Sequence, residues 1–220
     1  MLAGTPQAAP AGVKGFDANT VITESQADAF WSAGYRFALR YVGRTEMKSN
    51  DLTADEASML LSRGFALMTV QHVKNEGWMP TGDLGTEYGA NAAAFTRQIG
   101  FPGGVNLWMD LEGVSTSAAA PDVIAYCNNW YTQVANAGYV PGIYVGWEPG
   151  LTGSQLYSKL RFQHYWAAYN VDGASRPDPR GWQLMQSSGS GKVGSLDTDV
   201  YDVDHTYVDK LGGQVLWLKV

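Results

Sequence analysis

The sequence predicts an α/β domain: a (β/α)8-type TIM barrel that is trimmed and irregular in its last three strands. Three observations lead to this fold class. Short apolar segments of strand type alternate with helical segments through the first five strands. Helical segments repeatedly end in glycine followed by an aromatic residue, roughly 30 to 38 residues apart, about the length of one βα unit. Eight such strands can be counted, and eight parallel-type strands are the number that closes this kind of barrel.

The eight strands are expected at residues 13–16, 36–42, 66–72, 105–111, 140–145, 165–169, 182–186 and 199–203. Because helices separate the first five, these strands should be parallel. The connections after residue 145 are short and rich in Gly, Pro and Ser, including a loop at 187–194, and a ninth strand at 215–219 should close the end. An open doubly wound sheet is the alternative architecture.

The helices carry their own signals. Capping boxes begin at Thr23 and Thr53. Two apolar stripes at helical spacing are interpreted as packing surfaces that face the core. They consist of Tyr88, Ala92, Phe95 and Ile99, and of Val123, Cys127, Trp130 and Val134.

Composition narrows the class of protein. Hydrophobic residues make up 45% and charged residues 16%, which indicates a compact domain at residues 12–220, preceded by a flexible leader at residues 1–11. A net charge of −6 without a cationic cluster argues against nucleic-acid binding, and no apolar run is long enough to span a membrane. One cysteine excludes an internal disulfide. We expect a monomer; no signal peptide is visible and the localisation stays open.

Asp110 and Glu112 stand two residues apart at the end of the fourth strand. Strand side chains alternate between faces, so both carboxyls project from the same face. Two acids on one face of an apolar strand are costly to bury without a purpose. Such a pair can keep one carboxyl protonated while the other is ionised, which suits acid–base catalysis. A solvent-exposed strand end is the alternative interpretation.

Active sites of such barrels form where the strands end. Asp17 ends the first strand and Asp204 follows the eighth, so acids from three strands should meet at one mouth. Glu112 is the expected acid, with Asp110 orienting it and Asp17 and Asp204 positioning sugar or water. The other candidates for substrate binding are Arg40, Tyr41, Gln71, Tyr144, Trp147, Trp166, Tyr169, Gln183 and Asp202.

The aromatic residues near strand ends add a second argument, because aromatic rings are flat platforms on which sugar rings pack. At least half of them should be core residues. They are Trp108, Tyr144, Trp147, Trp166, Tyr169 and Trp182. Carboxylates and aromatics, without a basic patch or a catalytic thiol, indicate glycoside hydrolysis without a cofactor.

The chain resembles the glycoside hydrolase-like domains known as domain of unknown function 1906, which are similar to the muramidases of glycoside hydrolase family 25. The resemblance runs from about residue 13 to 208. It is carried by Gly15-Phe16-Asp17, Arg40-Tyr41-Val42-Gly43, Asp110-Leu111-Glu112, Gly138-Tyr139-Val140-Pro141-Gly142-Ile143-Tyr144, Trp182-Gln183 and Val203-Asp204.

This resemblance implies a barrel that acts on bacterial cell-wall polysaccharide, with Glu112 as general acid and Asp17, Asp110 and Asp204 in the accompanying acid positions. Asp202 lies on the same strand face as Asp204 and could take its place. A barrel that binds glycan without cleaving it is the alternative. A third interpretation is a metal-dependent hydrolase that uses these acids with His72, although no histidine pair has the spacing of metal ligands.

Overall fold

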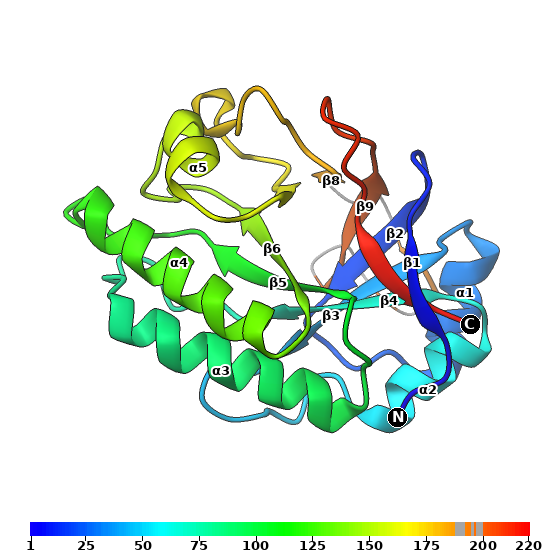
Figure 1. The fold of residues 1–220 in the computed structure, drawn as a ribbon. Coiled ribbons are helices and arrows are strands. Elements are labelled where there is room, and N and C mark those ends of the chain that lie inside the picture. Colours follow the sequence, from blue (N-terminus) through cyan, green and yellow to red (C-terminus); the bar gives the residue numbers. More distant parts are fainter. Residues whose placement is uncertain (188–191, 195, 197–199) are drawn as a thin grey trace.

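The computed structural model has a closed barrel of eight strands, which confirms the predicted fold class (Figure 1). It describes residues 1–187, 192–194, 196 and 200–220. Each strand from β2 to β9 pairs with the next one in the chain, including β4 with β5, and the pairing of β9 with β2 closes the barrel. The strands are β2 (Lys14–Ala18), β3 (Phe37–Val42), β4 (Ala66–Gln71), β5 (Asn106–Leu111), β6 (Val140–Val145), β7 (His164–Ala167), β8 (Leu184–Ser187) and β9 (Asp202–Thr206).

The last barrel strand runs in the opposite direction to the others. β2 to β8 are parallel to their neighbours in this series, but β9 is antiparallel to both β8 and β2. The expectation of eight parallel strands is therefore wrong for the eighth. Adjacent antiparallel strands need no crossover helix between them. This agrees with the connection from β8 to β9, which contains no described helix. The predicted strand began at Asp199, which lies outside the described residues, as does part of the predicted loop 187–194.

Helices cover the early strands. They are α1 (Glu24–Ser32), α2 (Ala54–Ser62), α3 (Gly82–Ile99), α4 (Ala120–Asn136) and α5 (Gly153–Lys159), followed by the single 3-10 turn η1 (Gly173–Ser175). The capping box at Thr23 is confirmed. The predicted box at Thr53 is incomplete. The Thr53 side chain caps α2, but the Glu56 side chain accepts from Ile22 N and Arg40 Nε.

The two longest helices, α3 and α4, lie side by side (Figure 1). Gly85 and Gly89 permit this approach, because a Cβ at either position would overlap the α4 backbone at Tyr126 or Trp130. The two predicted stripes face the core: all their residues are buried except Phe95, which is partly buried against it. Cys127 is a buried thiol, as expected.

A two-stranded ribbon made from the chain ends seals the barrel at the start of β4 and β5. β1 (Thr5–Ala8) pairs antiparallel with β10 (Leu216–Lys219), and β10 pairs with β4 at Leu218 and Leu67. β4 and β5 pair with each other only from Thr69 onward, so β10 occupies the space between their first halves. The predicted ninth strand is present, and residues 1–11 differ from the expected flexible leader because they contain β1.

No helix among the described residues is long and apolar enough to cross a membrane.

Candidate active site

Strand alternation decides which side chains fill the barrel. Trp108 and Asp110 of β5 point inward, opposite Gly142 and Tyr144 of β6. A Cβ at Gly142 would overlap the Trp108 ring, so glycine here makes room for the tryptophan. Trp166 of β7 packs edge-on against both Trp108 and Tyr144. This aromatic layer is the apolar floor beneath the carboxyl groups.

Five acids gather at the end of the barrel where β5 finishes. Asp110 and Glu112 rise from β5, and Asp17 from β2 pairs with Asp202 across the β2–β9 ladder. Asp204 pairs one step deeper, opposite Gly15. Because β9 is antiparallel, Asp202 lies nearer the mouth than Asp204. The predicted convergence of acids from the first, fourth and eighth strands is therefore present in the structure.

Hydrogen bonds hold Asp17 from two sides. Gln186 Nε2 donates to Asp17 Oδ2 at 2.9 Å, and the Tyr41 hydroxyl donates to Oδ1 at 3.4 Å. The Gln186 Oε1 atom in turn accepts from the Tyr144 hydroxyl at 3.1 Å. Burial, followed by the charge of Asp202, raises the pKa of Asp17 to about 7, although these hydrogen bonds oppose the rise.

Asp204 lies below Asp17 and is fully buried. Its Oδ1 accepts from Trp166 Nε1 at 2.8 Å, while no N–H or O–H group of the described residues donates to Oδ2. Burial, and then the charge of Asp17, raise the pKa of Asp204 well above its usual range. A protonated Asp204 can donate to Asp17, and this bond lowers the pKa of Asp17 and raises that of Asp204.

Asp110 and Glu112 also favour their protonated forms. Burial, then the charges of Glu112 and Asp17, raise the pKa of Asp110 well above its usual range. Burial, then the charge of Asp202, raises the pKa of Glu112. Asp110 Oδ1 is buried and has no hydrogen-bond partner among the described residues. Carboxyls from three strands thus affect one another's ionisation, which is the arrangement that separates an acid from a base.

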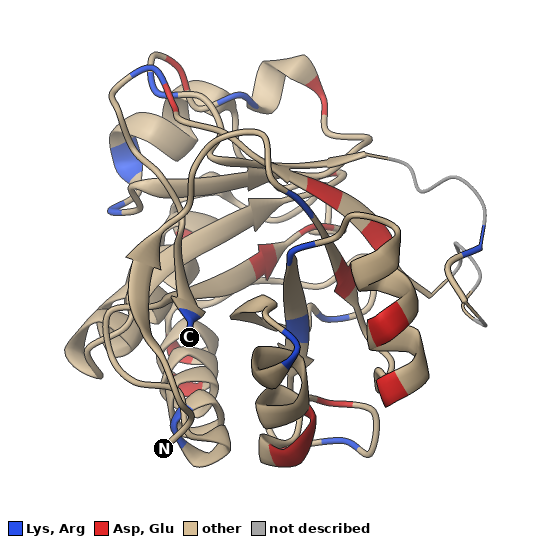
Figure 2. Cartoon of the chain, turned by 90° about the vertical axis from the view of Figure 1, so that its right-hand side faces the viewer, with Lys and Arg blue, Asp and Glu red and all other residues tan. Residues whose placement is uncertain are grey.

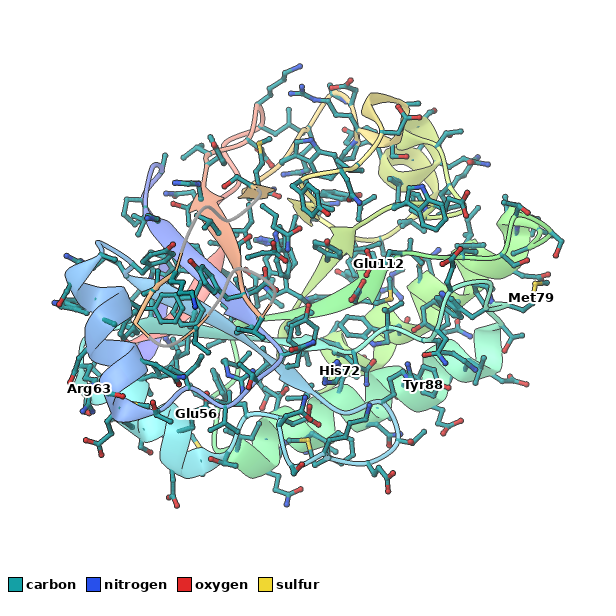
Figure 3. The ribbon with its side chains drawn as sticks, turned by 180° about the vertical axis from the view of Figure 1, so that it is seen from behind. Glu56, Arg63, His72, Met79, Tyr88 and Glu112 are labelled. Carbon is teal, nitrogen blue, oxygen red and sulfur yellow. The ribbon has the colours of Figure 1, made fainter. Side chains whose placement is uncertain are left out.

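Glu112, which is labelled in Figure 3, lines an open hollow of about 260 Å³. Its backbone carbonyl accepts from Trp78 Nε1 at 2.9 Å, and its side chain lies over Gly146, where a Cβ would overlap it. The hollow is also lined by Lys74, Glu76, Trp147 and Asn170. A separate hollow of about 90 Å³ is lined by Asp17, Tyr41 and Asp202. Both the acid and its neighbours can therefore be reached from solvent.

Two aromatic residues of the candidate set are exposed at this end. Trp147 is 44% exposed and Tyr169 58% exposed. The backbone around Trp147 is fixed, because Gly113 N donates to Trp147 O at 2.8 Å and Val114 N donates to Glu148 O at 3.0 Å. Glu148 has a positive φ of 47°, an uncommon conformation that often marks a functional loop.

Four predicted substrate contacts are instead structural. Trp166 is fully buried in the aromatic floor. Arg40 and Gln71 occupy outward-facing positions of β3 and β4, and Gln183 directly precedes β8, so these side chains lie in the layer between the barrel and the helices or loops. Arg40 Nε binds Glu56 Oε1 at 2.6 Å, Gln71 bonds to the Gly43 and Tyr88 carbonyls, and Gln183 bonds to Tyr165 N, Gln163 O and Asp209.

His72 does not join the acids. Its Nε2 lies 2.7 Å from Oδ1 of the buried Asp51, and its ring stacks on Tyr41. Among the described residues, no group of three His, Cys, Asp or Glu side chains has the arrangement of a metal site. The sequence-based set missed Gln186, although it ends a predicted strand, and also Lys74 and Glu76, which lie in a loop beyond the strand end.

Comparisons with known proteins agree with this fold. A family model described as "Rv2525c-like, glycoside hydrolase-like domain" matches residues 28–208, and a search of curated proteins found no significant match. The structure is similar to an uncharacterized B. stearothermophilus protein (19% identity, TM-score 0.67, covering 89% of this chain and 96% of that one). It is similar to the Tat-secreted protein Rv2525c of Mycobacterium tuberculosis (16% identity, TM-score 0.66, covering 93% of this chain and 99% of that one). It is also similar to the bacterial lysozyme from Streptomyces coelicolor (14% identity, TM-score 0.60, covering 92% of this chain and 95% of that one). At these identities the likeness shows the fold.

Proposed function

Because the chain belongs to the Rv2525c-like, glycoside hydrolase-like domain family, we propose that it is a glycosidase that cleaves bacterial cell-wall peptidoglycan in the manner of a muramidase. The observation that carries this proposal is the meeting of Asp17, Asp110 and Glu112 at one barrel end, where each carboxyl has a raised pKa. The similarity to a bacterial lysozyme supports the same substrate class.

Glu112 is the proposed general acid. It stands nearest the open hollow, and its raised pKa keeps a proton available for the leaving glycosidic oxygen. Asp110 lies one layer deeper on the same strand face, where we assign it the role of orienting Glu112; burial, and then the charge of Glu112, raise the pKa of Asp110. Asp17 receives more hydrogen bonds than the other acids, so it is the carboxylate best able to hold a negative charge beside the developing positive charge on the sugar.

The remaining candidates divide into two groups. Trp147 and Tyr169 offer exposed rings for the sugar, and Tyr41 and Asp202 line the smaller hollow beside Asp17. Tyr144 and Asp204 are buried under the carboxyls and act through them, Tyr144 by way of Gln186 and Asp204 by direct contact with Asp17. The proposed partner is the cell-wall polysaccharide, which places the protein's work outside the cytoplasm.

The test is clearing of a suspension of purified cell walls, followed by turbidity and by release of reducing sugar ends. Glu112→Gln should lower the rate by about 10²–10⁴-fold, the usual contribution of a general acid. Glu87→Gln, which removes an exposed carboxyl from α3, is the matched control and should clear walls like the wild type. Equal clearing by the wild type and Glu112→Gln would reject Glu112 as the acid.

Two further outcomes separate the alternatives. Co-sedimentation with cell walls without any release of reducing ends would support a glycan-binding barrel in place of an enzyme. Activity that is lost on addition of EDTA and restored by a divalent metal would support the metal-dependent alternative. Our proposal requires cleavage that EDTA does not reduce.

A further inference from the structure

The outer side of β8 is the part of the barrel wall where the β/α alternation ends. No described helix lies between β8 and β9 in the chain. Met185 points outward from β8 and is 38% exposed, whereas its neighbour Gln186 points inward to Asp17. A site on this outer side is therefore separated from the carboxyl groups by the barrel wall itself.

A hollow of about 180 Å³ lies on this outer side. The residues that line it include three cations, two aromatic residues and an exposed methionine. These six are Arg176, Arg180, Lys210, Trp182, Tyr207 and Met185. Figure 2 shows Lys and Arg segments (blue) beside Asp and Glu segments (red) in the loops at the top of the view.

The acidic residues here are already occupied. Asp209 is buried and accepts from Arg180 Nη1 at 2.7 Å and from the backbone N–H groups of Leu211 and Gly213 at 2.8 and 2.7 Å. Oδ1 of the exposed Asp178 lies 3.3 Å from Arg176 Nε and 3.6 Å from Lys210 Nζ, so this carboxylate forms ion pairs with both cations. Three cations face two acids, so the surface is locally positive on a chain whose net charge is −6.

One buried donor beside this hollow has no hydrogen-bond partner among the described residues. Arg180 is only 13% exposed at its side chain, and its Nε–H makes no hydrogen bond to any described residue. A buried donor without an acceptor costs about 1–3 kcal/mol, more when the group is charged. The Arg180 Nε atom itself is covered, so an oxyanion that enters the hollow would meet the exposed Arg176 and Lys210, whose side chains are 44% and 62% exposed. Guanidinium groups match carboxylate and phosphate oxygens in geometry.

The aromatic residues extend the argument from an anion to a sugar chain. Trp182 and Tyr207, the latter 41% exposed, provide flat apolar faces beside the cations. We propose that this hollow is a second binding site, outside the barrel, for an acidic polysaccharide: a sugar chain that carries phosphate or carboxylate groups. The cations contact the anionic group and the rings contact the sugar. This site goes beyond the proposed glycosidase function and holds the protein on a polymer while the acids work elsewhere.

The test is binding of the full chain to three soluble polymers by calorimetry: a poly(glycerol phosphate) wall polymer, polygalacturonate and neutral dextran. We expect the phosphate or the carboxylate polymer to bind more tightly than dextran and to weaken as salt rises from 50 to 300 mM. The variant Arg176→Gln/Lys210→Gln should lose at least about tenfold in affinity, because two exposed charges leave the site. Arg180 is kept, because its removal would leave the buried Asp209 carboxylate without its counter-charge.

Two controls locate the effect. Lys159→Gln removes an exposed cation from the end of α5 and should bind like the wild type, and so should Glu87→Gln, which removes an exposed carboxyl from α3. Unchanged affinity in Arg176→Gln/Lys210→Gln, or an equal loss in Lys159→Gln, would overturn the proposal. So would binding to phosphatidylglycerol vesicles without binding to either acidic polymer, since Val208 and Leu211 are also exposed near this site and a membrane surface would then be the partner.

Discussion

The side-chain amide of Gln186 donates to Asp17 Oδ2 at 2.9 Å and accepts from the Tyr144 hydroxyl at 3.1 Å. The bond to Gln186 lowers the pKa of Asp17, against burial and Asp202, which raise it. Gln186→Met removes the donor at similar size, so the pKa of Asp17 should rise above its value of about 7.

If catalysis needs Asp17 ionised, the acidic limb of the kcat/KM profile should then move to higher pH in Gln186→Met. The measurement is cell-wall cleavage between pH 4 and 9. Gln98→Met, at an exposed position on α3, is the control and should leave the profile in place. An unshifted acidic limb in Gln186→Met would mean that Asp17 does not set it.

Asp204→Asn should preserve the structure, because the amide reproduces the protonated acid. Its oxygen can accept from Trp166, and its Nδ2 can donate to Asp17. The pKa values of Asp17 and Asp204 are both raised in the folded state, so the folded protein keeps protons that the unfolded chain releases near pH 4. The contribution of these two acids to the free energy of unfolding should therefore be greatest below about pH 4 and should fall as the pH rises through 7.

Thermal unfolding at pH 5 and pH 8 measures this dependence. Asp204→Asn should have a higher Tm than the wild type at pH 8, by roughly 2–4 °C for each kcal/mol gained, and the difference should shrink at pH 5. A lower Tm at pH 8 would show that Asp204 is ionised and stabilising in the folded protein.

Much of the site was predictable, because alternation along one strand fixes relative position. Asp110 and Glu112 had to share a face once the strand was recognised, and the ends of parallel strands had to meet Asp17. The sequence could not show which face of β3 or β4 looked inward. In a barrel wrapped by helices both strand faces are buried and apolar, so Arg40 and Gln71 carried no sign that they faced α2, α3 and α4.

The direction of β9 was also beyond the sequence. A short apolar strand has the same sequence pattern whether it runs parallel or antiparallel to its neighbours. Its direction depends on the pairing with β2 and β8. That direction decides whether Asp202 or Asp204 stands nearer the mouth. The sequence favoured Asp204 for the catalytic set, with Asp202 as its substitute, whereas the structure puts Asp202 nearer the mouth.

The buried pair of Arg40 and Glu56 should govern stability without contacting substrate. Arg40 Nε lies 2.6 Å from Glu56 Oε1, Arg40 also donates to the Ala18 and Asn50 carbonyls, and Figure 3 shows Glu56 well away from Glu112. Glu56→Gln leaves a buried guanidinium without its counter-charge, which should cost about 3–5 kcal/mol in the free energy of unfolding.

Urea denaturation measures the loss, and KM for cell walls should stay within twofold of the wild type at a temperature where both proteins are folded. The variant Arg40→Met/Glu56→Leu, which removes both charges, should recover part of the stability. A raised KM with unchanged stability in Glu56→Gln would instead support the original expectation that Arg40 binds substrate.

Gly146→Ala tests whether the position of Glu112 matters as much as its presence. A Cβ at Gly146 would overlap the Glu112 side chain at Oε2 and Cβ, so the acid must move away from its place beside the hollow. Displacement of a catalytic group by about 1 Å can cost on the order of 10²-fold in rate, and we expect that loss in kcat with the fold retained. Gly173→Ala is the matched control, because a Cβ there meets nothing within 4 Å and should change neither kcat nor Tm. Wild-type kcat in Gly146→Ala would contradict a role for Glu112 that depends on where its carboxyl lies.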